Sequence, residues 1–220
     1  MAADGAANYL RAFDGSGGSS SDAPEPGWTR TLNVIVGDLD SLTEETAEFY
    51  TTGLTPTTII ADSDQNSTDF FKAVMHIRSR IGPKLIIVMG SLDGRVDQGV
   101  SQLHHLYLFQ KDDPHYQLGQ VLLFTPSSVV FLLKAGKHAI KVRGEVFPAE
   151  DAFTKYVGIL PLAGPAVIST EGLEWDVKDW ETQFGGQVST SNHVLPDTQV
   201  VTVQTDADVL FTIALNVGGQ

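Results

Sequence analysis

Two aspartates, Asp38 and Asp40, stand one residue apart directly after the apolar run at residues 32–36. In an extended chain, side chains at positions i and i+2 point to the same side, so both carboxylates would face one ligand. Carboxylate oxygens suit Mg²⁺, which usually takes one or two carboxylates together with substrate phosphates. The alternative for so short a pattern is an Asp-rich turn with helix-capping acids.

A second group of polar side chains lies at the predicted start of a helix. Ser67 is placed to cap this helix, in which Asp69 and Lys72 would share a face at a spacing of three. Asp64 and Gln65 come just before it, where free backbone N–H groups and the helix dipole favour anions. Taken alone, the Asp69–Lys72 pair also fits an ordinary solvated ion pair.

A third group follows the strongest apolar run, residues 84–89. Gly90 and Gly94 allow the backbone to approach a ligand closely, and Arg95 offers a planar guanidinium to phosphate oxygens. Three successive strand ends therefore carry glycine or charged groups, which favours a phosphate–metal site over independent surface decoration. Asp4 is either a further acidic ligand or part of a turn.

The elements that must position these residues alternate between strands and helices up to about residue 109. Expected strands cover residues 32–36, 57–61 and 84–89, and expected helices cover residues 43–51, 67–81 and 97–110. Continuous apolar runs are typical of strands buried on both faces of a parallel sheet. The pattern predicts a doubly wound α/β domain with ligands at the carboxyl ends of its strands.

The second half of the chain changes character after about residue 118. Short β-rich runs split by Gly, Pro, Asn and Asp predict an antiparallel β-sandwich. We place the domain boundary near Ala135, giving an α/β domain at 1–134 and a sandwich at 135–220. Residues 15–27, rich in Gly, Ser and Pro, predict a flexible loop and not a dinucleotide fingerprint, because no strand precedes them.

Composition narrows the classes of partner. A net charge of −13 over 220 residues argues against nucleic-acid and anionic-membrane surfaces, although a divalent cation can bridge acids to a nucleotide. The absence of cysteine excludes disulfides and thiolate nucleophiles. No apolar run reaches the roughly 18 residues of a membrane helix, and no leader pattern is visible, so we expect a cytoplasmic protein. Neither a G-x-S-x-G elbow nor a P-loop motif occurs.

Four N-terminal motifs and most of the second half resemble the thiamine pyrophosphokinase family. The motifs are ADGAAN (3–8), GDLDSL (37–42), DQNSTDFFK (64–72) and GSLDGRVDQ (90–98), followed by YVGILPLAGP, STEGLEW, FGGQVSTSN and VTVQTDADVLFTIAL. The resemblance implies an α/β catalytic domain, a thiamine-binding β-sandwich and a homodimer with active sites at the subunit interface. It also implies Mg²⁺-dependent transfer of a diphosphate from ATP to the hydroxyethyl oxygen of thiamine, with release of AMP.

The resemblance further implies roles for individual residues. The expected metal-binding and catalytic acids are Asp38, Asp40 and Asp69, with Lys72 and Arg95 on the phosphates. The residues expected to bind ATP are Asp4, Gly37, Asp64, Gln65, Thr68, Gly90, Arg95, Asp97 and Gln98. Those expected to line the thiamine pocket are Ser169, Trp175, Ser189, Ser191 and Asn192. An aromatic face such as that of Trp175 can hold a flat cation, and the alternative is a core tryptophan.

Two departures from the family pattern leave other functions open. Ala6 and Tyr9 replace a glycine and an arginine of the family motif, and the chain starts so close to Asp4 that the family's first strand is expected to be missing. One alternative is an N-terminally truncated, catalytically impaired paralogue that binds thiamine. A less favoured alternative is a metal-dependent D-x-D glycosyltransferase, which explains neither the 67–81 helix nor the β-rich half.

Overall fold

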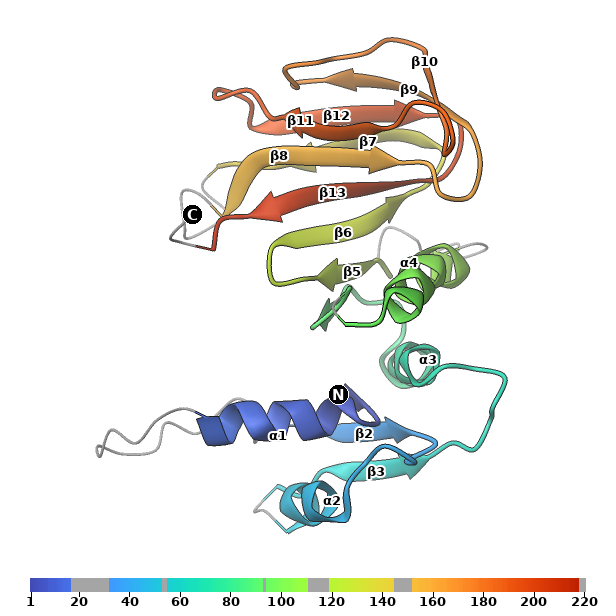
Figure 1. Ribbon diagram of the computed structural model, residues 1–220, viewed down its shortest axis with the longest axis vertical. Helices are drawn as coiled ribbons and strands as arrows, with labels where there is room; N and C mark the ends of the chain where they lie inside the picture. The colour runs from blue at the N-terminus through green and yellow to red at the C-terminus, as the bar shows by residue number, and fades with distance from the viewer. Residues whose placement is uncertain (17–31, 53–54, 93, 111–118, 145–151, 218–220) are drawn as a thin grey trace, which may run out of the picture. The chain divides into compact units, whose positions relative to one another are not determined.

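The computed structural model describes residues 1–16, 32–52, 55–92, 94–110, 119–144 and 152–217. The chain divides into two compact units, Met1–Gly82 and Pro83–Gln220 (Figure 1). The loop expected at residues 15–27 lies outside the described residues except for its first two, which end a helix.

The first unit is a three-stranded parallel sheet with helices. Its strands are β1 (Ala2–Ala3), β2 (Val34–Gly37) and β3 (Thr58–Ala61), in the order β1-β2-β3, and its helices are α1 (Ala6–Ser16), α2 (Glu44–Thr51) and α3 (Asp69–Ile81). A buried cluster joins Ile35 of β2 to Ala7 of α1 and Tyr50 of α2, while α3 packs against β1 and β2. The sheet thus carries helices that bring polar groups to the carboxyl ends of its strands.

The expectation that no strand precedes the first motif is wrong. Ala2 and Ala3 form β1, which pairs in parallel with Ile35 and Val36 of β2. Asp4 N–H then donates to the carbonyl of Val36 at 2.9 Å, which extends the pairing by one residue. A two-residue strand is enough to place Asp4 at the carboxyl end of the sheet.

Threonines cap α2 and α3. Thr43 Oγ1 accepts from Thr46 N–H at the start of α2, and Thr68 Oγ1 accepts from Phe71 N–H at 3.2 Å at the start of α3. The α3 cap is therefore Thr68 and not Ser67, whose hydroxyl donates instead to Asp64 Oδ2 at 2.7 Å. The helix begins at Asp69, two residues after the start of the expected range 67–81.

The second unit contains one helix and ten strands among its described residues. These are β4 (Ile86–Met89), α4 (Val96–Gln110), β5 (Val121–Phe124), β6 (Ser128–Leu133), β7 (Gly136–Lys141), β8 (Phe153–Leu160), β9 (Ala166–Glu171), β10 (Trp180–Thr182), β11 (Ser189–His193), β12 (Val200–Thr205) and β13 (Val209–Leu215). They form a four-stranded sheet, β10-β9-β12-β7, and a six-stranded sheet, β11-β8-β13-β6-β5-β4. All neighbours are antiparallel except β4 and β5, which are parallel.

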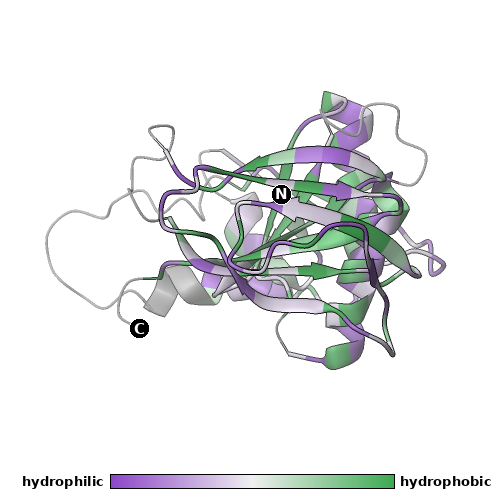
Figure 2. Ribbon diagram, turned by 90° about the horizontal axis from the view of Figure 1, so that it is seen from above, coloured by the Kyte–Doolittle hydropathy of each residue, from purple (hydrophilic) through white to green (hydrophobic). Residues whose placement is uncertain are grey.

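Side chains from both sheets share one hydrophobic core. Ile168 of β9 and Val203 of β12 meet Ile159 of β8 and Phe211 of β13, all with almost no exposed surface. Alternate residues of β12 are buried, as expected for strands with one face on a sandwich core. Figure 2 shows hydrophobic residues along these strands and hydrophilic residues in many of the connecting turns.

The predicted class, a mixed α/β part followed by an antiparallel β-rich part, is confirmed, and the sheets are open. The two compact units divide after Gly82, whereas the expected domain boundary lies near Ala135. The reason for this division is that β5 pairs with both β4 and β6, which ties residues 86–133 to the sandwich sheet. Helix α1 and strand β10 were not expected from the sequence.

Candidate active site

Three carboxylates converge at the carboxyl ends of β1 and β2. Asp4, Asp38 and Asp40 each offer an oxygen within 4.8 Å of those of the other two. The chain between Asp38 and Asp40 is not extended as expected, because Leu39 has a φ of +67°. The two side chains meet through a turn, in which Asp40 N–H donates to Asp38 Oδ1 at 3.3 Å.

Asp69 reaches the same place from the first turn of α3. Its Oδ1 accepts from Asp38 N–H at 3.2 Å. Gly37 makes this approach possible, since a Cβ at this position would lie 2.6 Å from Asp4 Cβ and 2.9 Å from Asp69 Oδ1. The expected role of Gly37 at the site therefore has a steric basis, which is that two acids pack against its α-carbon.

Asp4 is the most constrained member of the cluster. Its residue is 2% exposed, Oδ2 accepts from Ser41 N–H at 3.1 Å, and Oδ1 is buried with no hydrogen-bond partner. Burial raises the pKa of its carboxyl, and the nearby charges of Asp69, Asp38 and Asp40 raise it further. A buried, unpartnered carboxylate oxygen among other carboxylates fits a hard divalent cation such as Mg²⁺.

Lys72 lies beneath the acids rather than in solvent. Its side chain is 2% exposed, and Nζ donates to the carbonyl of Asp62 at 2.9 Å and to Asp69 Oδ1 at 3.3 Å. The reading of Asp69 and Lys72 as a solvated surface pair is therefore wrong. A buried ammonium bonded to Asp69 offsets part of the repulsion between that carboxylate and its acidic neighbours.

The loop before α3 orders one acid of the cluster. Gln65 Nε2 donates to Asp38 Oδ2 at 3.0 Å, and this bond, with the Asp40 N–H, lowers the pKa of the Asp38 carboxyl. Asp64 is turned to its own loop, where Oδ1 accepts from Asn66 N–H at 2.9 Å. The Thr68 hydroxyl accepts from the helix backbone as a cap. Gln65 thus touches the acid cluster, while Asp64 and Thr68 support the loop and helix around it.

The glycine-rich stretch expected to bind phosphate lies in the second unit, between β4 and α4. Gly90 and Gly94 have φ values of +77° and +79°, a region that favours glycine. Arg95 donates from Nε and Nη2 to the two oxygens of Asp97 at 3.0 and 2.5 Å, and both side chains are largely exposed. Asp97 and Gln98 lie in the first turn of α4. The loop presents an exposed guanidinium next to a helix N-terminus.

Trp175 is an exposed residue and not the core tryptophan of the alternative reading. It is 54% exposed, and its ring lies 4.9 Å from that of His193. The Asn192 side chain, expected to line the pocket, bonds the Trp175 backbone: Oδ1 accepts from N–H at 3.2 Å and Nδ2 donates to the carbonyl at 2.9 Å. Ser191, with a φ of +55°, sits in a bulge of β11 beside Asn192.

Ser169 and Ser189, the other serines expected to bind thiamine, make no hydrogen bond to Trp175 among the described residues. Ser169 on β9 accepts from Asp179 N–H at 2.9 Å, and Ser189 begins β11 opposite Ile159. The structure thus groups Trp175 with Asn192 and the bulge at Ser191, whereas Ser169 contacts the segment just after Trp175.

Comparison with protein families now decides the relationship. The family model described as "Thiamin pyrophosphokinase, catalytic domain" matches residues 1–118, and "Thiamin pyrophosphokinase, vitamin B1 binding domain" matches residues 137–210. The chain belongs to the thiamin pyrophosphokinase family.

Relatives and solved structures of this family agree. Thiamine pyrophosphokinase 3 of Oryza sativa subsp. japonica is 32% identical over 225 residues, which cover 98% of this chain and 78% of that protein. The Saccharomyces cerevisiae thiamine pyrophosphokinase is 26% identical over 98% of this chain and 77% of its own. The crystal structure of yeast thiamin pyrophosphokinase has a TM-score of 0.78, 25% identity and coverage of 98% and 77%. The structure of the Candida albicans protein, at 23% identity and a TM-score of 0.77, shares the fold.

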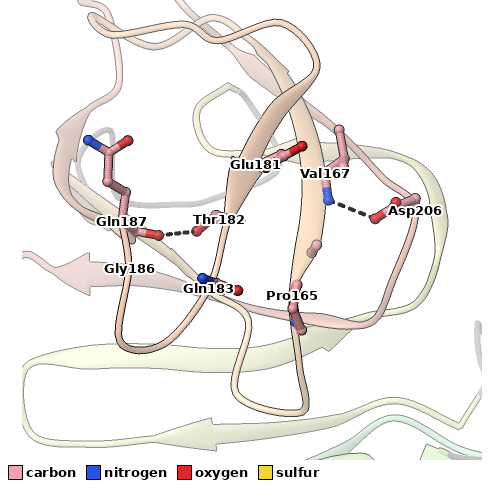
Figure 3. Close-up of a pocket in the computed structure, with 9 residues that line it drawn as sticks. Pro165, Val167, Glu181, Thr182, Gln183, Gly186, Gln187 and Asp206 are labelled. Atoms are coloured by element: carbon pink, nitrogen blue, oxygen red, sulfur yellow. Dashed lines mark hydrogen bonds between the residues drawn. The ribbon is translucent and has the colours of Figure 1, made fainter.

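The second unit has a separate cavity of about 410 Å³, which lies beside the four-stranded sheet (Figure 3). Its walls come from β9, β10 and the turn that follows, with Thr182 Oγ1 donating to the carbonyl of Gln187 at 2.8 Å and Val167 N–H donating to Asp206 at 2.7 Å. Pro165, Gly186, Gln187 and Asp206 of the family motifs line it, but none of the residues to which the resemblance gives a role does. We therefore assign no part of the site to this cavity.

Sequence reasoning missed two side chains beside Trp175, which are Glu174 and His193. His193 Nδ1 lies 2.5 Å from Glu174 Oε2. Their only signal in the sequence is adjacency to Trp175 and Asn192, which gives no indication that β11 brings them together.

None of the helices in the described part of the chain has both the length and the apolar character of a membrane span.

Proposed function

We propose that the chain transfers the diphosphate group of ATP to thiamine, giving thiamine diphosphate and AMP. The observation that carries this proposal is the convergence of Asp4, Asp38, Asp40 and Asp69 at one sheet edge in a chain of this family. In this reaction the hydroxyethyl oxygen of thiamine attacks the β-phosphorus, the bond from that phosphorus to the α-phosphate oxygen breaks, and AMP leaves. The hydroxyl proton passes to a carboxylate of the cluster.

Asp4, Asp38 and Asp40 are the residues we propose to hold Mg²⁺, with Asp69 beside them. When bound, the ion supplies positive charge next to the phosphate oxygens. The buried and unpartnered Oδ1 of Asp4 supports this assignment, because a buried carboxylate oxygen without a partner is costly unless a cation binds it.

Other residues of the chain prepare the acids and hold the phosphates. Gln65 fixes the orientation of Asp38, and Lys72 offsets the charge of Asp69 from the protein side. Arg95 is exposed and already presents two donors to a carboxylate, a geometry that phosphate oxygens also accept. Gly90, Gly94 and the start of α4 let that loop approach a phosphate closely. Phosphoryl transfer depends mainly on such positioning.

The thiamine ring system is proposed to lie against Trp175. An exposed indole face attracts a flat cation, and thiamine carries a permanent charge on its thiazolium ring. We further propose a homodimer whose active sites lie between subunits, as the family resemblance implies, and a cytoplasmic location.

A discontinuous assay with purified protein, thiamine, ATP and Mg²⁺ tests the reaction. AMP, ADP and thiamine diphosphate are resolved together, and AMP and thiamine diphosphate are expected in equal amounts. ADP in place of AMP would contradict diphosphate transfer. Thiamine binding without product, from a folded protein, would favour the catalytically impaired paralogue.

Two variants assign the parts of this proposed site. Asp40→Asn removes one carboxylate charge at an exposed position, so turnover should fall by about 100-fold or more with little change in Tm. Trp175→Ala should raise the KM for thiamine more than the KM for ATP. Wild-type turnover in the first variant would refute the metal assignment, and an unchanged thiamine KM in the second would refute the role of Trp175.

A further inference from the structure

The imidazole of His193 lies against the indole of Trp175 at the edge of the six-stranded sheet. The ring centroids are 4.9 Å apart with an interplanar angle of 47°. Tyr156 on the neighbouring strand β8 meets the same imidazole edge-on, at 5.2 Å and 74°. One face of the exposed indole is therefore backed by a ring that is itself packed against a second ring.

Glu174 fixes the orientation of that imidazole. His193 Nδ1 and Glu174 Oε2 are 2.5 Å apart, and the side chains are 19% and 48% exposed. A hydrogen bond at Nδ1 restricts rotation of the imidazole about its Cβ–Cγ bond. The face that His193 turns to Trp175 is thus set by the residue directly before that tryptophan.

Asn192 fixes the backbone of both aromatic residues. Its Oδ1 accepts from the N–H groups of Trp175 and His193 at 3.2 and 2.8 Å, and its Nδ2 donates to the Trp175 carbonyl at 2.9 Å. Asn192 is only 5% exposed. Both lone pairs of Oδ1 are already engaged, so the side chain is better suited to holding Trp175 than to binding a ligand.

We propose that Asn192, His193 and Glu174 are positioning residues that hold the Trp175 indole ready for a planar, cationic heteroaromatic ring. This proposal rests on the proposed function, in which that ring belongs to thiamine. Holding the indole in place before binding lowers the conformational entropy lost on binding. The three residues should therefore change thiamine affinity and leave the chemical step alone.

Steady-state kinetics separate positioning from a general structural role. His193→Ala should raise the KM for thiamine about 3- to 10-fold while kcat and the KM for ATP stay unchanged. His193→Phe keeps a ring against Trp175 but loses the bond to Glu174, so its thiamine KM should lie between those of His193→Ala and the wild type. His104→Ala, which removes an exposed histidine on α4, is the matched control and should behave as wild type.

A spectroscopic readout reports Trp175 directly. The chain has three tryptophans, so protein labelled with 5-fluorotryptophan gives three ¹⁹F resonances, and loss of one in Trp175→Phe assigns the signal of Trp175. In His193→Ala this signal should shift and broaden while the other two stay in place. An unchanged thiamine KM together with an unchanged Trp175 signal would overturn the proposal.

Glu174→Ala gives a second test in case His193→Ala fails to fold. Glu174 is half exposed, so its loss should be tolerated, and releasing the imidazole should raise the thiamine KM about 2- to 5-fold and shift the Trp175 signal. Glu171→Ala removes an exposed acid three residues before Glu174, at the end of β9, and controls for the loss of one negative charge. Equal effects in the two variants, with no change at Trp175, would refute positioning. A wild-type protein that neither binds nor converts thiamine would instead refute the proposed function, and the ¹⁹F signal would still decide whether His193 holds Trp175.

Discussion

At neutral pH, the charged carboxylate of Asp4 makes the folded protein less stable than it would be with this carboxyl protonated. Burial and the neighbouring acids raise its pKa in the folded state. A raised acid pKa means that the folded state binds a proton more tightly than the unfolded chain does, so stability is lost as pH rises through the folded pKa. The site thus keeps an unfavourable charge, as expected where a cation binds.

Asp4→Asn should therefore raise the Tm at pH 7.5 without Mg²⁺, with each 1 kcal/mol corresponding to about 2–4 °C at this chain length. The gain should shrink as pH falls through the raised pKa of the folded state, and it should be gone below about 4, where the unfolded carboxyl is also protonated. Adding Mg²⁺ should stabilise the wild type and not the variant. Thermal unfolding at the two pH values, with and without Mg²⁺, measures this, and a lower Tm for the variant at pH 7.5 without Mg²⁺ would contradict it.

Sequence reasoning found most of the residues of this cluster but not their arrangement. The spacing of Asp38 and Asp40 suggested one face of an extended chain, whereas a positive φ at Leu39 brings them together in a turn. Backbone dihedrals of a non-glycine residue at φ > 0 are uncommon and are not predicted by propensity. The burial of Lys72 likewise depends on the carbonyl of Asp62, ten residues earlier, which no local pattern reveals.

At the scale of elements, helix α3 ties local stability to the geometry of the site. Its cap, Thr68, precedes Asp69 directly, so fraying of the first turn would displace an acid of the cluster. The apolar runs predicted β2, β3 and β4 and the following helices to within about two residues. The sequence did not predict α1, which runs into the Gly/Ser segment, or β10, whose three residues are specified by pairing with β9.

Loss of either threonine cap should cost similar stability but have different effects on activity. Thr68→Ala and Thr43→Ala each remove a side-chain acceptor at a helix N-terminus, worth about 1 kcal/mol. Only Thr68→Ala should raise the Mg²⁺ concentration needed for half-maximal turnover, because α2 carries none of the four acids. Chemical denaturation and Mg²⁺ titration of both variants measure this. The same Mg²⁺ requirement in both variants would contradict the coupling of α3 to the site.

At the scale of the whole molecule, the four acids belong to the first unit and Trp175 belongs to the second. We propose that each active site of the homodimer takes its acids from one subunit and Trp175 from the other. The Asp40→Asn and Trp175→Ala proteins are mixed in equal amounts under conditions that allow subunits to exchange. Half of the dimers should then contain one subunit of each kind and carry one intact site of two, which restores about a quarter of wild-type activity. Activity is measured at a thiamine concentration below the KM of the Trp175 variant. No recovery, with exchange verified by differently tagged subunits, would place both parts in the same subunit.

The order of strands in the six-stranded sheet bears on how the protein is made. β13, at residues 209–215, lies between β8 and β6, so the ribosome synthesises the shared neighbour of both strands last. Before β13 is made, the edges of β6 and β8 that it pairs with have no partner. Val129 of β6 and Val157 of β8 also cannot yet pack with Phe211 and Ile213 of β13, which belong to the same core. The pairing of β6 and β8 through their shared neighbour therefore cannot form until β13 has been synthesised. Until β13 emerges, growing chains must keep two unpaired strand edges from pairing with other polypeptides.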